Sequence, residues 1–147
     1  MRAAKMLSTI VLCMAAAAAQ AQVQVKEPWV RATVPGQKAT GAFMQLTAPN
    51  GARLVEAKSP VAGVVEIHEM AMVDNVMKMR AIPGLDLPAG KPVELKPGGY
   101  HVMLMDLKNT VKEGDSVPIT LVVEGKDKKR ENVEVKATAR PLGAPAG

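Results

Sequence analysis

The sequence predicts an all-β fold: an antiparallel sandwich of two sheets in a single domain. Two observations support this fold class. Glycine, proline, asparagine and aspartate recur about every ten residues, which is the spacing of short strands joined by turns. After the first 21 residues, no window repeats apolar side chains at the i, i+3, i+4, i+7 spacing of an amphipathic helix. A chain of 147 residues is long enough to bury one core.

Five strands are predicted in the first half of the chain, and turn residues separate them. A Pro-Gly pair at 35–36 ends the first strand, and a Pro-Asn-Gly triplet at 49–51 ends the second. The predicted strands span residues 23–32, 42–48, 53–57, 64–72 and 76–82.

The second half begins with a predicted loop at 83–92, which holds three prolines and two glycines. A brief strand at 92–95 and a clear strand at 99–107 follow. Residues 117–123 and 132–138 form a closing hairpin around 125–130. We expect residues 22–140 to form the domain and residues 141–147 to form a disordered tail.

Residues 1–21 have the features of a cleaved secretory signal peptide. Arg2 and Lys5 are followed by an apolar or small stretch, and Ala19-Gln20-Ala21 has the small-x-small pattern of a cleavage site. A membrane anchor is the alternative, but the apolar run is short for one. The sequence therefore predicts an exported protein whose mature chain begins at Gln22.

The mature composition excludes several classes of protein. Without Arg2 and Lys5, 17 basic residues remain against 14 acidic ones, and aromatic residues are 2% of the chain. This mild charge and the lack of stacking residues argue against nucleic acid as a partner. No second long apolar run is present, so no membrane span is expected in the mature chain. Cleavage also removes Cys13, the only cysteine, so neither a disulfide nor a thiolate ligand is expected.

Histidine and methionine are concentrated in a few strands. Both histidines of the mature chain begin a His-x-Met triplet, at His68 and His101. Because strand side chains alternate between faces, His68, Met70 and Met72 share one face, as do His101, Met103 and Met105. If these two strand systems face each other, one end of the sandwich holds two imidazoles and several thioethers.

A two-residue turn at Asp74-Asn75 would extend this face, because both residues tolerate positive φ. The resulting register pairs Met72 with Met77 and Met70 with Met79. Met79 then lies diagonally from His68, about 7–8 Å away between backbones and within reach of a long side chain. The same register places Glu69 and Arg80 on the other face as a pair of opposite charges.

Two imidazoles and two thioethers form a soft, neutral donor set, which suits Cu(I) better than zinc, magnesium or calcium. The alternative is that these methionines fill the core and the histidines are structural. Two His-x-Met triplets on the only two histidines favour a metal site. Met44, on a strand without histidine, is assigned to the core. The residues alone leave Met70 and Met79 equally attractive as ligands.

The pattern also resembles a known family, the periplasmic copper chaperones called PCu(A)C. It consists of His68, ten intervening residues, Met79, twenty-one more, and then His101-Val102-Met103. Residues 29–31, 35–36 and 95–101 are similar to the same family. The resemblance covers nearly the whole mature chain. It implies a cupredoxin-like antiparallel Greek-key β-sandwich, a location in the periplasm and a monomer.

The resemblance further implies that the Cu(I) ligands are His68, Met79, His101 and Met103, with Met70 as the alternative ligand. Met70, Met72, Met77 and Met105 would then form an apolar surround that keeps water from the metal. The implied function is delivery of Cu(I) to a partner, either cytochrome c oxidase subunit II, for assembly of its dinuclear copper centre, or another periplasmic copper chaperone. The same residues could also bind Cu(II), more weakly than Cu(I). The tail at 141–147 contains neither histidine nor methionine, so no second site is expected there.

The sequence also bears on three other functions. A blue-copper electron carrier needs a cysteine thiolate, which the mature chain lacks. A zinc hydrolase would need Glu69 or Asp106 beside a histidine, but both are expected on the opposite strand face. We therefore expect no enzyme activity. A metal-independent structural or interaction module of the periplasm remains the alternative function.

Overall fold

The computed structural model describes residues 23–141, and these residues form ten strands. The predicted signal peptide and residues 142–147 of the predicted tail lie outside the described residues. The strands are β1 (Gln24–Arg31), β2 (Ala39–Thr47), β3 (Ala52–Lys58), β4 (Ala62–Val73), β5 (Val76–Ala81), β6 (Leu85–Leu87), β7 (Val93–Leu95), β8 (His101–Leu107), β9 (Ser116–Gly125) and β10 (Arg130–Arg140). The all-β prediction is confirmed. Within residues 23–141 there is no helix of the length and hydrophobicity that crossing a membrane requires.

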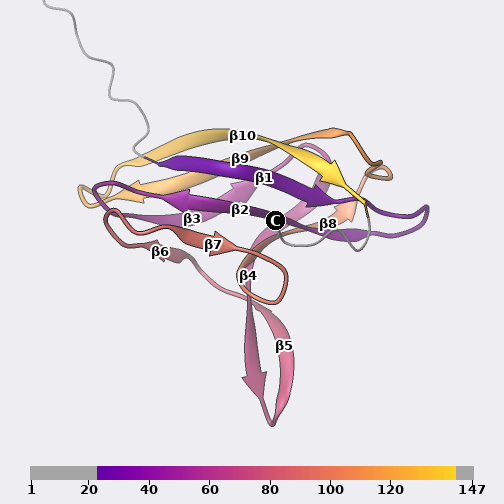
Figure 1. The fold of residues 1–147 in the computed structure, drawn as a ribbon, viewed down its shortest axis with the longest axis horizontal. Coiled ribbons are helices and arrows are strands. Elements are labelled where there is room, and N and C mark those ends of the chain that lie inside the picture. Colours follow the sequence, from indigo (N-terminus) through magenta and orange to yellow (C-terminus); the bar gives the residue numbers. More distant parts are fainter. Residues whose placement is uncertain (1–22, 142–147) are drawn as a thin grey trace, which may run out of the picture.

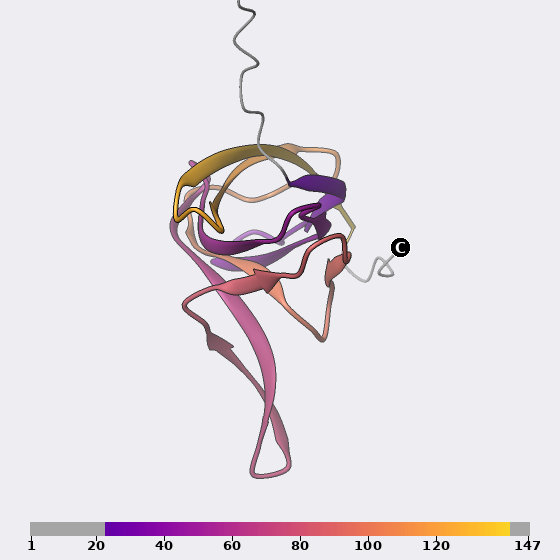
Figure 2. The same cartoon turned by 90° about the vertical axis from the view of Figure 1, so that its left-hand side faces the viewer.

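The strands join into one continuous sheet, where two separate sheets had been expected. Its order is β5-β4-β8-β2-β1-β10-β9-β3-β6, with β7 paired to β2. The sheet curls over to form two layers (Figures 1 and 2). The strands pair antiparallel, as predicted, except that β1 and β10 pair in parallel. The predicted loop at 83–92 also contains a short strand, β6, whose leucines reach the core and pair with β3.

The main core lies between the two layers. It takes side chains from every strand except β5, including Val102 and Leu104 of β8 and Ile67 of β4. Met44 is buried in this core, as predicted. Because strand side chains alternate, the residues next to these on β4 and β8 must point away from the core. His68, His101 and Met103 are therefore on the outer face of the sheet.

The hairpin of β4 and β5 has the predicted turn and register. Asp74 and Asn75 both have positive φ, at 51° and 64°, as a two-residue hairpin turn of the favoured handedness requires. Met72 pairs with Met77 and Met70 with Met79. On the reverse face, the Nε of Arg80 donates to Glu69 Oε1 at 2.7 Å.

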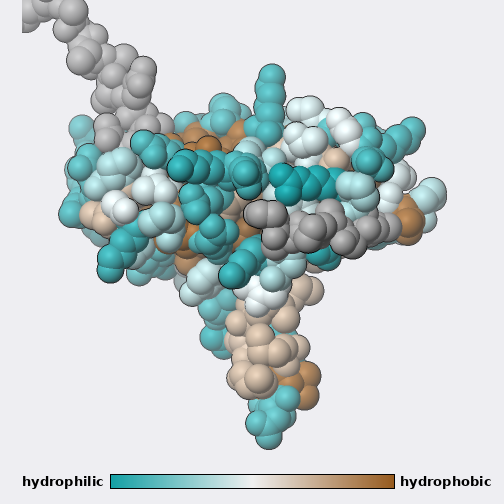
Figure 3. All heavy atoms as spheres, viewed as in Figure 1, coloured by the Kyte–Doolittle hydropathy of each residue, from teal (hydrophilic) through white to brown (hydrophobic). Residues whose placement is uncertain are grey.

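This hairpin projects from the sandwich, as Figures 1 and 2 show. β5 is the last strand at its edge of the sheet, and every residue in it is exposed. In Figure 3 the middle of the projecting part is weakly to strongly hydrophobic and its tip is hydrophilic, while the sandwich above it is mostly hydrophilic. The hairpin extends the outer face of β4 into solvent.

Candidate metal centre

The two histidines lie directly opposite each other on neighbouring strands. β4 and β8 are antiparallel, and their register pairs His68 with His101. The ring centroids are 5.6 Å apart and the rings are inclined at 56°. The two strands were expected to face each other across the sandwich, but they lie side by side in one sheet. The order of strands in the sheet nevertheless brings the two imidazoles together, as expected.

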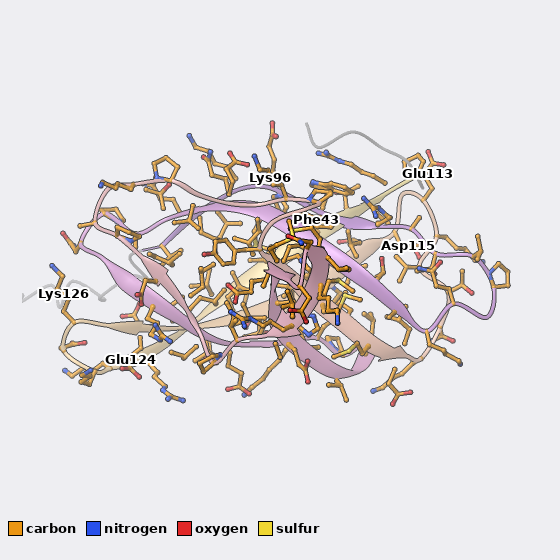
Figure 4. The ribbon with its side chains drawn as sticks, turned by 90° about the horizontal axis from the view of Figure 1, so that it is seen from below. Phe43, Lys96, Glu113, Asp115, Glu124 and Lys126 are labelled. Atoms are coloured by element: carbon orange, nitrogen blue, oxygen red, sulfur yellow. The ribbon has the colours of Figure 1, made fainter. Side chains whose placement is uncertain are left out.

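Both imidazoles are buried although they lie outside the main core, with 9% of His68 and 5% of His101 exposed. A small aromatic cluster provides part of the cover. The Phe43 ring lies 6.2 Å from the His101 ring and 4.6 Å from the Trp29 ring, measured between centroids. Figure 4, viewed from the side on which the hairpin projects, shows Phe43 beside the hairpin.

The backbone sets the orientation of His101. Its Nδ1 lies 3.1 Å from the carbonyl oxygen of Gly99. A carbonyl only accepts hydrogen bonds, so Nδ1 donates and the lone pair resides on Nε2. Burial lowers the pKa of His101, the Gly99 carbonyl raises it, and the neighbouring His68 lowers it further, for a net lowering. The imidazole is thus held neutral, the form that binds metal.

Glu66 sets the orientation of His68. The Nε2 of His68 lies 2.7 Å from Glu66 Oε2. A carboxylate only accepts, so this nitrogen donates its proton and the lone pair resides on Nδ1. That Nδ1 is buried and has no hydrogen-bond partner. A buried acceptor without a donor costs about 1–3 kcal/mol, and a bound cation would satisfy it.

The thioethers lie around an open groove beside the histidines. The groove has a volume of about 280 Å³, and its lining includes His101, Met70, Met79 and Met103. Met103 pairs with Gly41 of β2 on one side and with Glu66 of β4 on the other. Gly41 has no side chain, and this leaves room for the Phe43 ring, because a Cβ atom at Gly41 would lie 2.9 Å from Cζ of Phe43.

The predicted ligands His68, Met79, His101 and Met103 all lie on this outer face, and so does the alternative ligand Met70. Met70 and Met79 both line the groove, so the geometry does not choose between them. The proposed role of Met72 and Met77 as a water-excluding surround is wrong. These side chains are 63% and 49% exposed, because they lie beyond the sandwich on the projecting hairpin.

Glu66 is the residue that sequence reasoning missed. The two carboxylates weighed there were Glu69, which pairs with Arg80 on the reverse face, and Asp106. The signal was available, because a residue two positions before His68 on a strand shares its face. Residues 23–141 contain no group of three or more histidine, cysteine, aspartate or glutamate side chains able to hold a metal. A metal bound here would need the thioethers.

The fold and this face together define a class: a small β-sandwich with histidine and methionine gathered on one outer face. The chain belongs to the family described as "Putative lipoprotein LpqE-like", whose model matches residues 23–137. Among its relatives is "Putative lipoprotein Lxx21020" of Leifsonia xyli subsp. xyli, 35% identical over 100 residues, which are 67% of this chain and 60% of that protein. The "Uncharacterized protein RP573" of Rickettsia prowazekii is 33% identical over 123 residues, 80% of this chain and 68% of that one.

Several solved structures have the same fold. The solution structure of Cu(I)-DR1885 from Deinococcus radiodurans is 31% identical, with a TM-score of 0.61, over 85% of this chain and 83% of that one. The apo form of DR1885 matches 95% of both chains, with a TM-score of 0.59. The copper-bound PCuAC domain of PmoF2 is 23% identical, with a TM-score of 0.65, over 82% of this chain and 94% of that domain. At this last identity the likeness shows the fold alone.

Proposed function

We propose that this protein is a periplasmic copper chaperone of the PCuAC type. It binds one Cu(I) tightly through His68, Met79, His101 and Met103 and transfers it to a partner. The observation that carries the proposal is the direct pairing of the two histidines, with ring centroids 5.6 Å apart, beside a groove lined by three thioethers.

The donor atoms match the chemistry of Cu(I). Thioether sulfur and imidazole nitrogen are soft or borderline ligands, and Cu(I) prefers them where hard cations do not. His68 Nδ1 and His101 Nε2 are the two ring nitrogens left without a protein partner by the hydrogen bonds to Glu66 and Gly99. The carboxylate of Glu66 adds a negative charge close to a site whose ligands are all neutral.

The position of the site suits transfer. Met79 is 52% exposed and lines the open groove, which the buried His101 also lines. A ligand from the acceptor protein can reach the copper from the side of Met79. Each new bond to the acceptor then replaces one bond to this chain, and the metal stays Cu(I) throughout, so the transfer needs no oxidant or reductant.

The comparisons support this proposal at a coarser level. DR1885, whose Cu(I) form has a solution structure, shares the fold at 31% identity. The family and one relative are described as lipoproteins, which agrees with export. The chain spans only 60% of the length of that relative. The acceptor we propose is cytochrome c oxidase subunit II, for assembly of its dinuclear copper centre, or another periplasmic copper chaperone.

The test is an anaerobic Cu(I) titration against a competing chelator. Wild type and His101→Ala are compared, with Tyr100→Phe as the control, because Tyr100 is the exposed neighbour of His101. We expect one tight equivalent in wild type and in the control, and its loss in His101→Ala. Circular dichroism establishes that each variant is folded. Equal weak binding by all three proteins would favour the alternative, a metal-independent interaction module.

Transfer is tested separately from binding. The Cu(I)-loaded protein is mixed with the apo copper-binding domain of cytochrome c oxidase subunit II, and the two are separated and assayed for copper. We expect copper to move to the acceptor. Tight binding without any transfer would show storage, which contradicts the chaperone role.

A further inference from the structure

The two faces of the projecting hairpin have different compositions. The outer face of β4 and β5, continuous with His68, carries four methionines in two cross-strand pairs, Met70 with Met79 and Met72 with Met77. The reverse face carries the other residue types: Glu69, Ala71, Val73, Val76, Lys78 and Arg80. All of the sulfur is on the face that leads to the histidines.

Core packing does not explain the outer pair. Met72 and Met77 are 63% and 49% exposed. Methionine usually fills gaps in a core, and a solvent-exposed thioether gains little from burial. A surface that only docked an apolar partner would have no need for sulfur, and valine serves as the apolar residue at the same tip, at Val73 and Val76.

The register brings three thioethers together that the proposed Cu(I) site does not use. Met72 and Met77 are direct cross-strand neighbours, with Cβ atoms about 4.5–5.5 Å apart in such a pair. Met70 is the next residue of β4 on the same face. Its side chain lies at the groove, between the tip and the histidines. Long, flexible thioethers at this spacing can converge on one soft cation.

We propose that Met70, Met72 and Met77 form a second, weaker site for Cu(I), made of thioethers alone, at the outer end of the hairpin. The same site takes Ag(I), which is also a soft monovalent cation. This second site rests on the proposed function and extends it. At the second site copper is captured from solvent or released into it, and copper is exchanged with the buried histidines along the same face of the sheet. Three thioethers without an imidazole bind Cu(I) more weakly than the proposed four-ligand site beside Glu66.

The test follows the methionine methyl groups by NMR during an anaerobic Ag(I) titration. The protein carries ¹³C at these methyls, so each thioether reports its own ligation. We expect the first equivalent to shift the signals of Met79 and Met103, and the second to shift those of Met70, Met72 and Met77. Thioethers do not titrate near neutral pH, so the second equivalent binds equally well at about pH 7 and about pH 5.

The double variant Met72→Leu/Met77→Leu gives the second arm of the test. We expect it to lose the second equivalent and keep the first. The control is Val73→Leu/Val76→Leu, a change to the same residue at the same tip but on the reverse face of the hairpin; it keeps both equivalents. Leucine preserves the volume, and both hairpin positions are exposed, so the variant folds.

The outcomes separate the two proposals. If the first equivalent binds and the second moves no methyl of the hairpin tip, the second site does not exist. If the double variant retains the second equivalent, the site is elsewhere and the assignment is wrong. If even the first equivalent fails to bind, the proposed function itself fails.

Discussion

Met70 and Met79 are direct neighbours across the hairpin, and both reach the groove beside His101. We predict that Met79→Leu lowers the affinity for the first Cu(I) by roughly tenfold or more. Loss of a residue that only supports a ligand can already have an effect of this size. Met70→Leu should change that affinity little. Leucine keeps the volume, so the difference reports the lost sulfur. A chelator competition measures both affinities, and the reverse ranking would make Met70 the ligand.

The affinity for Cu(I) depends on pH through the histidines. Burial is the main cause of the lowered pKa of His101, so its imidazole stays neutral to a lower pH than a free one, whose pKa is about 6.5. Below that range protons compete with the metal. We predict that Cu(I) affinity falls between about pH 7 and about pH 5. The measurement is a competition corrected for protonation of the chelator; constant affinity would exclude both histidines as ligands.

The same shift has a consequence for the apo protein. Because the pKa of His101 is lower in the folded chain than in the unfolded one, the unfolded chain takes up a proton first as the pH falls. The contribution of neutral His101 to the stability of the folded protein is therefore fully present above about pH 6.5. It declines as the pH falls from there through the pKa of His101 in the folded state.

Glu66 is expected to act on copper through His68. We predict that Glu66→Gln weakens the tight Cu(I) site by about 10–100-fold, because an outer-shell carboxylate both orients the ring and supplies charge. Glu69→Gln is the matched control, since Glu69 pairs with Arg80 on the reverse face. Competitive titration of both variants tests this. Equal affinities would show that the contact between Glu66 and His68 has no part in binding.

At the scale of the elements, β2 contributes Gly41 to the lining of the groove. A Cβ atom added there would lie 2.9 Å from Cζ of Phe43, a ring already packed against Trp29 and close to His101. We predict that Gly41→Ala destabilises the apo protein by about 1–3 kcal/mol, the usual cost of overpacking. It should also weaken Cu(I) binding.

Chemical denaturation and Cu(I) competition measure the two effects of Gly41→Ala. Adding Phe43→Leu to Gly41→Ala removes the ring that the new methyl group meets, so the double variant should recover part of the lost stability. Unchanged stability in the single variant would mean that Phe43 moves aside freely.

The elements also show what could be predicted from sequence. The β4–β5 hairpin was predictable in full, because turn residues and alternation are local properties of Asp74, Asn75 and their neighbours. The pairing of His68 with His101 was not, because alternation gives the face of a residue but not the order of strands in the sheet. β6 escaped prediction because three residues between prolines and glycines carry too short a pattern.

For the whole molecule, copper should stabilise the folded state, because the unfolded chain has no formed site. At free Cu(I) about 100-fold above the Kd, the expected gain is about 2.7 kcal/mol. Thermal unfolding in buffered Cu(I) measures it as a raised Tm in wild type. His101→Ala should show no rise at the same free Cu(I). An equal rise in both proteins would place the stabilising copper elsewhere.

The sheet order also determines when the site comes into being. His68 and His101 belong to strands that are not consecutive, and the chain between them makes β5, β6 and β7 before β8 returns to pair with β4. Pairing between such distant segments is among the slower steps of folding, because the entropy cost of closing the loop comes before any stabilising contact forms. The complete copper site we propose therefore forms only after β8 has paired with β4. A newly made chain becomes able to receive metal only once the middle of its sheet has closed, so the rate of folding sets the earliest moment at which the protein can begin to work.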